Sequence, residues 1–301
     1  MKTSKRVSPK PVPAHRAAPA FLGTEYANAP AGRAAFHVIP APMEVSVSYG
    51  GGAARGALAI LRASGQLEAH DRGLAPGRLG IHTQPSIRLP RRASAEAWLD
   101  AIQSRVARTL AVGARPLLLG GEHTVTLGAA RALAAADKEP VGFIHIDAHA
   151  DLRDTFEGTP LSHACVMRRV AELGFPLVQF GTRAYAAEEA DFRRRSRIRA
   201  YDADALLDAP LPRAPFPARF PRRLYITFDL DGLDPSQMPA TGTPVAGGLA
   251  WHQAMRLLDR VTRGRTVIGA DVVELAPIPG LHHADFTAAQ TAHRLLALMM
   301  P

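Results

Sequence analysis

The chain has 301 residues, of which 47% are hydrophobic and 21% are charged. This length and composition suffice for one sizeable hydrophobic core and exclude a mainly disordered chain. The net charge of +9 raises the question of a nucleic-acid partner, but only 6% of the residues are aromatic and the arginines are spread in small groups. We therefore expect solvated basic faces and no nucleic-acid partner.

The single cysteine, Cys165, cannot form a disulfide within the chain, which indicates a reducing compartment and thus the cytoplasm. No apolar run reaches about 18 residues, so we expect no membrane span and no membrane partner. Residues 1–20 are basic and rich in proline and alanine, which predicts a flexible tail rather than a signal peptide. Residues 21–301 are predicted to form a single catalytic domain.

Short apolar runs alternate with helical patterns along this domain. In chain order, we expect a helix capped by Ser94 and running to Ala111, a strand at 116–119, a helix at 124–136 and a strand at 141–146. A helix capped by Ser162 and ended by Gly174 follows, then a strand at 177–180, a Pro-rich surface loop at 208–223 and a strand at 224–230. The last elements are a helix at 251–262, a strand at 266–273 and a helix at 285–299.

This alternation predicts an α/β fold with a mostly parallel sheet that is covered by helices on both faces. In such sheets, ligands bind at the carboxyl ends of the strands. We therefore expect the chemically active residues directly after the apolar runs.

The most specific motif follows the strand at 141–146. Asp147, His149 and Asp151 lie two residues apart, so in an extended chain their side chains share one face, with Ala148 and Ala150 between them. Three ionisable groups on one face are costly to bury unless a cation lies among them. The spacing therefore favours a metal site.

Two further segments place metal-ligand types after apolar strands. Asp229 and Asp231 end the strand at 224–230, and His123 follows the turn-forming pair Gly120 and Gly121. Taken alone, each has a simpler interpretation as a turn or cap residue. Because the carboxyl ends of parallel strands meet at one edge of a sheet, the three segments together predict one metal centre.

The ligand types select the metal. Four carboxylates and two imidazoles without a thiolate make a hard, oxygen-rich site, which favours Mn²⁺. Six ligands exceed what one ion with an open position needs. We therefore expect two Mn²⁺ ions per chain, which together would turn water into hydroxide near neutral pH.

These segments resemble the motifs of the ureohydrolase family, which includes arginases and agmatinases. The resemblance runs from about residue 45 to the C-terminus and covers the segments 120–124, 147–151, 162–164, 229–235, 241–244 and 269–274. It implies a three-layer α/β/α sandwich, two Mn²⁺ ions, a small guanidino substrate and assembly as homo-trimers or homo-hexamers. The implied reaction is hydrolysis of a guanidino C–N bond.

The resemblance also implies roles for individual residues. One ion would be held by His123, Asp147, Asp151 and Asp229, and the other by Asp147, His149, Asp229 and Asp231. Asp231 would pass a proton to the leaving amine, His163 would carry protons at the mouth of the site, and Glu274 would bind the guanidinium. Thr243 would support either Glu274 or the substrate.

Simpler interpretations of these residues also exist. His163 would merely begin a helix, Glu274 would be a surface charge, and Thr243 would belong to a turn. Cys165 lies near His163 and suggests a Cys–His nucleophile, but hydroxide from the metal pair already supplies the nucleophile.

The loop at 152–162 is expected to select the substrate. It lacks the residues with which arginases hold an α-amino acid, so we expect agmatine, cleaved to putrescine and urea, rather than L-arginine. Asp154 or Glu157 would attract the ammonium of agmatine. Arg153 indicates the opposite, a carboxylate, so guanidinobutyrate and guanidinopropionate stay open, as do arginase and formimidoylglutamase activities.

Two other classes of protein are alternatives to a ureohydrolase. A single-zinc deacetylase of related fold would carry His at the position of Asp231. A non-enzymatic basic binding protein would not need all six ligands. The number of bound metal ions per chain separates the three classes: about two, about one or none.

Overall fold

A single eight-stranded sheet organises the chain. The computed structural model describes residues 19–136, 139–208 and 211–301, so most of the predicted tail lies outside the described residues. Neighbouring strands are all parallel, in the order β2-β1-β3-β8-β7-β4-β5-β6. The strands are β1 (Phe36–Ala41), β2 (Ile81–Thr83), β3 (Arg115–Gly120), β4 (Val141–Ile146), β5 (Leu177–Phe180), β6 (Arg199–Tyr201), β7 (Arg223–Asp229) and β8 (Thr266–Val273).

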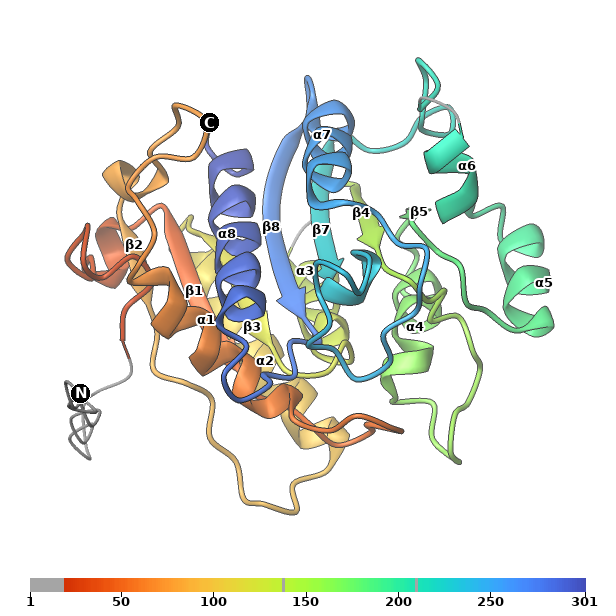
Figure 1. Cartoon of the computed structure of the whole chain (residues 1–301), viewed down its shortest axis with the longest axis horizontal. Helices are drawn as coiled ribbons and strands as arrows, with labels where there is room; N and C mark the ends of the chain where they lie inside the picture. Colours follow the sequence, from red (N-terminus) through yellow and green to blue (C-terminus); the bar gives the residue numbers. More distant parts are fainter. Residues whose placement is uncertain (1–18, 137–138, 209–210) are drawn as a thin grey trace, which may run out of the picture.

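Helices cover both faces of this sheet (Figure 1). One face carries α1 (Gly56–Ser64), α7 (Trp251–Thr262) and α8 (His282–Leu298). The other carries α2 (Ala95–Ala111), α3 (Val125–Ala136) and α4 (Val166–Glu172). The short helices α5 (Ala187–Arg195) and α6 (Ala203–Asp208) lie beyond β5, toward the β6 edge. The expected three-layer α/β/α sandwich is thereby confirmed.

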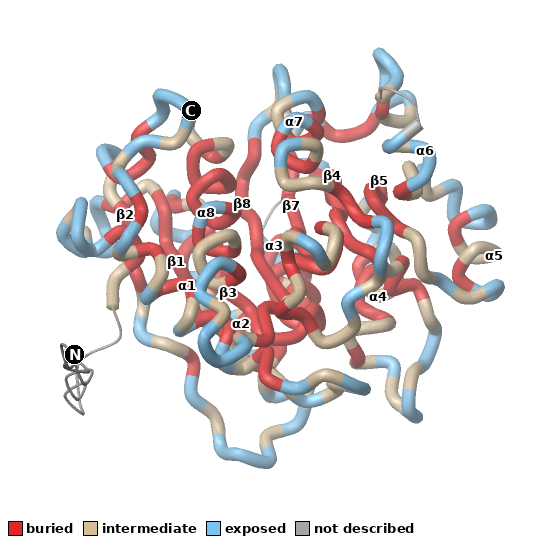
Figure 2. The backbone as a smooth tube through the Cα atoms, in the orientation of Figure 1, coloured by how far each residue is buried: buried red, intermediate tan, exposed pale blue. Residues whose placement is uncertain are grey.

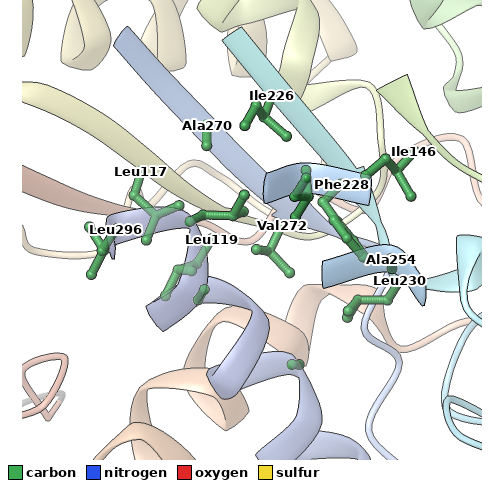
Figure 3. Close-up of a cluster of buried hydrophobic side chains, with 14 of the residues drawn as sticks. Leu117, Leu119, Ile146, Ile226, Phe228, Leu230, Ala254, Ala270, Val272 and Leu296 are labelled. Atoms are coloured by element: carbon green, nitrogen blue, oxygen red, sulfur yellow. The ribbon is translucent and has the colours of Figure 1, made fainter. Parts of the chain in front are cut away.

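The sheet is the buried centre of the molecule, because its strands feed two apolar cores (Figure 2). Leu117 and Leu119 of β3 point into the core beneath α1, α7 and α8, while Leu118 between them points into the opposite core. Figure 3 shows the first core, where Leu296 of α8 and Ala254 of α7 lie among side chains of the central strands. Burial on both faces explains why these strands are continuous apolar runs in the sequence.

Most predicted elements are present with small shifts at their ends. Ser94 caps α2 through a 3.2 Å bond from the Ala97 amide. The capping role of Ser162 is wrong: its side chain makes no capping bond, and the His163 amide donates instead to Ser46 Oγ at 3.1 Å. The amide of Cys165, which a capping side chain could have bound, donates to the backbone carbonyl of Ser162 at 3.0 Å.

Several short elements were not predicted, namely β1, β2, β6, α1, α5 and α6. Residues 211–222 form neither helix nor strand, as expected for the Pro-rich loop. Among the described residues, no helix is both long enough and apolar enough to cross a membrane.

Candidate functional site

The predicted site residues lie at the carboxyl ends of four adjacent strands in the middle of the sheet. In sheet order, β3 leads to His123, β8 to Glu274, β7 to Asp229 and Asp231, and β4 to the segment 147–151. These four strands run parallel, so their carboxyl ends lie at the same edge of the sheet. Segments that are far apart in the sequence therefore meet there.

His123 lies at the centre of this group and is fully buried. Its Nδ1 atom lies 3.0 Å from Asp147 Oδ2, 3.0 Å from Asp151 Oδ2 and 3.3 Å from Asp229 Oδ2. Four ligand atoms from three strand ends thus converge on one point.

The opposite nitrogen of His123 fixes the state of its ring. Thr227 donates its hydroxyl proton to Asp271 Oδ1 at 2.7 Å, so the same oxygen, 2.7 Å from His123 Nε2, accepts the proton of that nitrogen. In the neutral ring, the form that can bind a metal, Nδ1 then carries a lone pair, and this atom has no hydrogen-bond partner among the described residues. A lone pair facing three carboxylate oxygens requires a cation, so these residues fit a metal ion.

A second ligand group lies beside the first. His149 Nδ1 lies 3.0 Å from Asp231 Oδ2 and 3.5 Å from Asp147 Oδ1. Asp147 therefore presents one oxygen to His123 and the other to His149, as expected for a carboxylate between two ions. Asp229 uses its second oxygen to accept the Asp231 amide at 2.8 Å.

His145 also lies close enough to the first group to be counted as a ligand. Its Nε2 atom, however, lies 2.7 Å from Asp147 Oδ2, and its Nδ1 atom lies 2.9 Å from the side-chain amide of Gln179. Because both ring nitrogens already have partners, we do not count His145 among the ligands. The six residues that the sequence predicts are brought together without it.

The shifted pKa values of the cluster without metal indicate the same need for positive charge. Burial and the nearby Asp147 raise the pKa of Asp151 to about 7, and burial with the nearby Asp231 raises the pKa of Asp229 well above its usual range. Burial lowers the pKa of His149, but its bonds to Asp147 and Asp231 outweigh this and raise it to about 12. Without metal, protons would occupy the place of the cations.

Two site residues have strained backbone conformations. Asp151 has a φ of 53° and Glu274 a φ of 66°, both in the left-handed region that side chains other than glycine rarely adopt. The Asp151 carbonyl accepts the amides of Met167 and Arg168 at the start of α4, and the Glu274 amide donates to Gly121 at 2.8 Å. Such strain is common at functional sites, where the surrounding structure holds it in place.

Glu274 and Glu122 flank His123 from two sides. Glu274 Oε1 accepts the His123 amide at 2.6 Å, and burial with the nearby Glu122 raises the Glu274 pKa to about 8. Glu122 is fully buried and accepts the amides of Val45 and Ser46 at 2.8 and 2.7 Å. It thereby ties the loop before α1 to the metal-ligand turn.

His163 is held by the same loop. Its amide donates to Ser46 Oγ, and its Nδ1 atom lies 3.2 Å from that oxygen. Burial lowers the pKa of His163, so its ring is neutral near neutral pH.

Two adjoining cavities lie against the cluster. The inner one, of about 20 Å³, is lined by every predicted ligand except Asp147, and by Glu274, His163, Thr243 and the loop 47–50. Its wall is tight: a Cβ on Gly50 would lie 2.6 Å from the Gly242 carbonyl oxygen. The outer cavity, of about 350 Å³, shares Ser48, His149, Asp151, His163 and Thr243 with the inner one and continues past Phe156 and Tyr185.

A larger cavity, of about 960 Å³, lies between α7 and the loop at 213–218. None of the predicted site residues lines it. We therefore place the chemistry in the two adjoining cavities, where the ionisable groups converge.

A model of the arginase family matches residues 34–300. This chain belongs to the arginase family. It is 38% identical over 281 residues to the N(1)-aminopropylagmatine ureohydrolase of Synechocystis sp., covering 91% of this chain and 90% of the relative. It is 36% identical to an agmatinase of Bacillus anthracis, covering 82% and 84% of the two chains. The agmatine ureohydrolase structure of Thermoplasma volcanium superposes with a TM-score of 0.80 at 28% identity, covering 90% and 92%.

Membership of the arginase family confirms the predicted resemblance. The chain is an agmatinase-like ureohydrolase, a hydrolase that acts on guanidino C–N bonds. Its His and Asp cluster is able to bind metal. The single-zinc deacetylase and the non-enzymatic binding protein are therefore set aside.

The residues expected to read the far end of the substrate are only partly brought to the site. Arg153 lines the outer cavity, 3.4 Å from Glu188. Asp154 instead faces outward and pairs with Arg169 at 2.8 Å and Arg168 at 3.4 Å, and neither it nor Glu157 lines either cavity. The carboxylates of Asp154 and Glu157 were expected to attract an ammonium, but Asp154 pairs with two arginines of α4 instead.

The thiol of Cys165 is buried, and burial raises its pKa to about 11. A protonated thiol is a poor nucleophile near neutral pH, so the Cys–His interpretation has no support in this arginase-family chain.

Sequence reasoning missed Arg183, which follows β5. Its guanidinium donates to the carbonyl oxygens of Asp231 and Val245 at 2.7 and 2.6 Å, and it thereby joins the metal-ligand turn to the loop that carries Thr243. Its position directly after an apolar strand, like those of the ligands, was the available signal.

Proposed function

We propose that this chain hydrolyses the guanidino group of N(1)-aminopropylagmatine or agmatine, releasing urea and a polyamine, with two Mn²⁺ ions per chain. The observation that supports this proposal most directly is the outer cavity of about 350 Å³. It is bordered by His149 and Asp151 of the cluster and leaves room for a long chain beyond the guanidinium. The names of the relatives support the same substrate class.

The proposed chemistry assigns a task to each group. Ions held by the six ligands would supply hydroxide near neutral pH. Glu274 would bind the guanidinium by charge-assisted hydrogen bonds and present its carbon to the ligand cluster, with Thr243 bordering the same space. Asp231 would pass a proton to the leaving amine, and neutral His163 would exchange that proton with solvent through the outer cavity.

The lining of the outer cavity suits an extended amine. Phe156 and Tyr185 offer aromatic surface, on which methylene groups and ammonium ions pack favourably. The positive charge of Arg153 is partly offset by Glu188. The resulting wall is amphipathic and does not present a concentrated positive charge.

Arg153 nevertheless supports a second candidate, a substrate with a terminal carboxylate such as guanidinobutyrate. Because Arg153 lines the cavity and Glu188 does not, a carboxylate could displace Glu188 and take over the guanidinium.

The experiment is a comparison of kcat/KM for urea release with Mn²⁺, using N(1)-aminopropylagmatine, agmatine, guanidinobutyrate and L-arginine. We expect the two amines to exceed the other two by roughly ten-fold or more, with the longer amine preferred. Tyr185→Ala should reduce that preference, while Tyr185→Phe keeps the ring and should retain it. Guanidinobutyrate as the best substrate would support the second candidate, and an absence of urea from all four would contradict the proposed function.

Assembly as a homo-trimer or homo-hexamer is part of the same proposal. The family resemblance supports it, and the molar mass in solution tests it. A monomer in solution would contradict it.

A further inference from the structure

A line of buried polar side chains runs from the metal cluster to the far side of β5. His145 and Gln179 are fully buried, and Arg193 is only 8% exposed. The contacts are 2.7 Å between Asp147 Oδ2 and His145 Nε2, 2.9 Å between His145 Nδ1 and Gln179 Nε2, and 2.7 Å between Gln179 Oε1 and Arg193 Nε. Polar groups at this depth are costly unless each has a partner.

The direction of every bond in this line follows from Arg193. Its Nε can only donate, so the atom of Gln179 that it contacts must be the carbonyl oxygen. The amide nitrogen of Gln179 then faces the other way and donates both of its protons, to Ala150 O at 2.7 Å and to His145 Nδ1. His145 Nδ1 therefore accepts, and the ring proton lies on Nε2 and points at Asp147.

Arg193 is itself fixed, so the line has a firm outer end. Its Nη1 donates to Asp202 Oδ1 at 3.0 Å, and its guanidinium lies 4.6 Å over the ring of Tyr185. Both contacts restrict its rotation and thereby the orientation of Gln179.

At its inner end, the line holds both the carboxylate and the backbone of the ligand segment. Asp147 Oδ2 receives the His145 proton, and Asp147 Oδ1 receives the His149 amide at 2.6 Å. Each oxygen therefore keeps one remaining lone-pair direction for a cation. The bond from Gln179 to Ala150 O fixes the chain between His149 and Asp151.

We propose that His145 is a positioning residue for the metal centre, held by Gln179 and Arg193 as a neutral donor that sets the plane of the shared carboxylate of Asp147. In this orientation, Asp147 turns one oxygen toward His123 and the other toward His149, so it would be able to serve both ions. This inference rests on the proposed two-ion centre. Its consequence is that His145, Gln179 and Arg193 determine how tightly both ions are held, although none of the three is a ligand.

The variants separate orientation from packing. His145→Leu removes the donor and keeps an apolar side chain of useful size. His145→Gln places an amide nitrogen near the position of Nε2 and keeps a donor. Gln179→Glu keeps the shape of Gln179 but removes the protons given to His145 and Ala150. Arg194→Gln is the matched control, since Arg194 neighbours Arg193 on α5 but is exposed and pairs with Asp191.

The readouts are the Mn²⁺ dissociation constants of each full-length protein by calorimetry, the spin-coupled Mn²⁺ signal by electron paramagnetic resonance, and denaturant unfolding without metal. We expect His145→Leu and Gln179→Glu to raise the dissociation constant of the weaker ion about 10- to 100-fold and to diminish the coupled signal. His145→Gln should recover most of the affinity, and Arg194→Gln should match wild type.

Wild-type dissociation constants in both His145→Leu and Gln179→Glu would overturn the inference, even if both proteins unfold more easily. If His145→Leu does not fold, Gln179→Glu decides alone. Failure of the wild-type protein to bind Mn²⁺ would overturn the two-ion centre itself and this inference with it, a result distinct from the first.

Discussion

The Nε2 atom of His123 lies 2.7 Å from the Oγ1 atom of Thr227, and this contact determines which nitrogen of His123 faces the carboxylates. Because Thr227 gives its own proton to Asp271, it can only accept from His123. The hydroxyl of Thr227 in β7 thus determines the orientation of the His123 ring, which follows β3.

Replacing Thr227 by valine should therefore weaken metal binding. Valine has nearly the same shape but leaves His123 Nε2 and Asp271 without their shared partner. We expect Mn²⁺ affinity to fall about 10- to 100-fold and the free energy of unfolding of the metal-free protein to fall by roughly 1–3 kcal/mol. Calorimetry and denaturant unfolding measure the two effects. Thr227→Ser keeps the hydroxyl and serves as the control; equal affinity in the serine and valine variants would show that the contact does not matter.

Replacing Glu122 by glutamine should loosen the loop before α1 while leaving the metal ligands in place. An amide can accept at only one of the two positions where Glu122 now accepts three bonds from Val45 and Ser46. Since Ser46 holds His163, we expect KM to rise and kcat to fall, each by about ten-fold, with the metal content unchanged. Steady-state kinetics and metal analysis check this, and a loss of metal without a kinetic change would contradict it.

Glu274 should make the metal-free protein less stable as the pH rises. Its folded pKa of about 8 lies above its unfolded value of about 4.3, so between these values the folded state holds a proton that the unfolded state has lost. Stability is therefore highest below this window and falls through it. Glu274→Gln removes this effect and keeps an acceptor for the His123 amide.

The measurement is urea unfolding at several pH values in the presence of a chelator. We expect Glu274→Gln and wild type to be equally stable near the acidic end of the window. The variant should be more stable at about pH 8, by an amount on the order of 1–3 kcal/mol, since the carboxyl is partly exposed to the inner cavity. A constant difference across the pH range would rule out the titration of Glu274 as its cause.

Replacing Arg183 by lysine should disturb two loops together. The guanidinium donates to carbonyls on both sides of the inner cavity, whereas an ammonium can reach only some of them. We expect kcat/KM to fall at least ten-fold and proteolysis within the loop 241–247 to speed up. The exposed Arg197, which follows α5, should change neither property when it is replaced in the same way.

The strand ends explain why so much of the site was predictable. Asp147, His149 and Asp151 follow an apolar run at alternating positions, and a parallel sheet brings such ends together. The same logic predicted the three-layer fold. Short elements such as β2 and β6 have only three residues each, too few to produce a periodic pattern.

The residues that support the site were harder to predict. His145 and Gln179 lie within strands, where a polar residue merely interrupts an apolar run, and their purpose is visible only once β4 and β5 are adjacent. For Asp154, the sequence suggested too much: its charge predicted a substrate contact. In the structure, Asp154 pairs with Arg168 and Arg169 of the next helix instead. The roles of His145, Gln179 and Asp154 thus depend on which residues of other elements they pair with in the fold.

We propose that a two-ion centre drives hydrolysis of a guanidino group, with the ions held by His123, Asp147, His149, Asp151, Asp229 and Asp231. The most direct test adds Mn²⁺ stepwise to metal-free protein and follows both the bound metal per chain and urea release from N(1)-aminopropylagmatine. We predict that urea release reaches its maximum when two ions are bound per chain. Full activity with one ion bound, or activity that does not depend on metal, would contradict the claim.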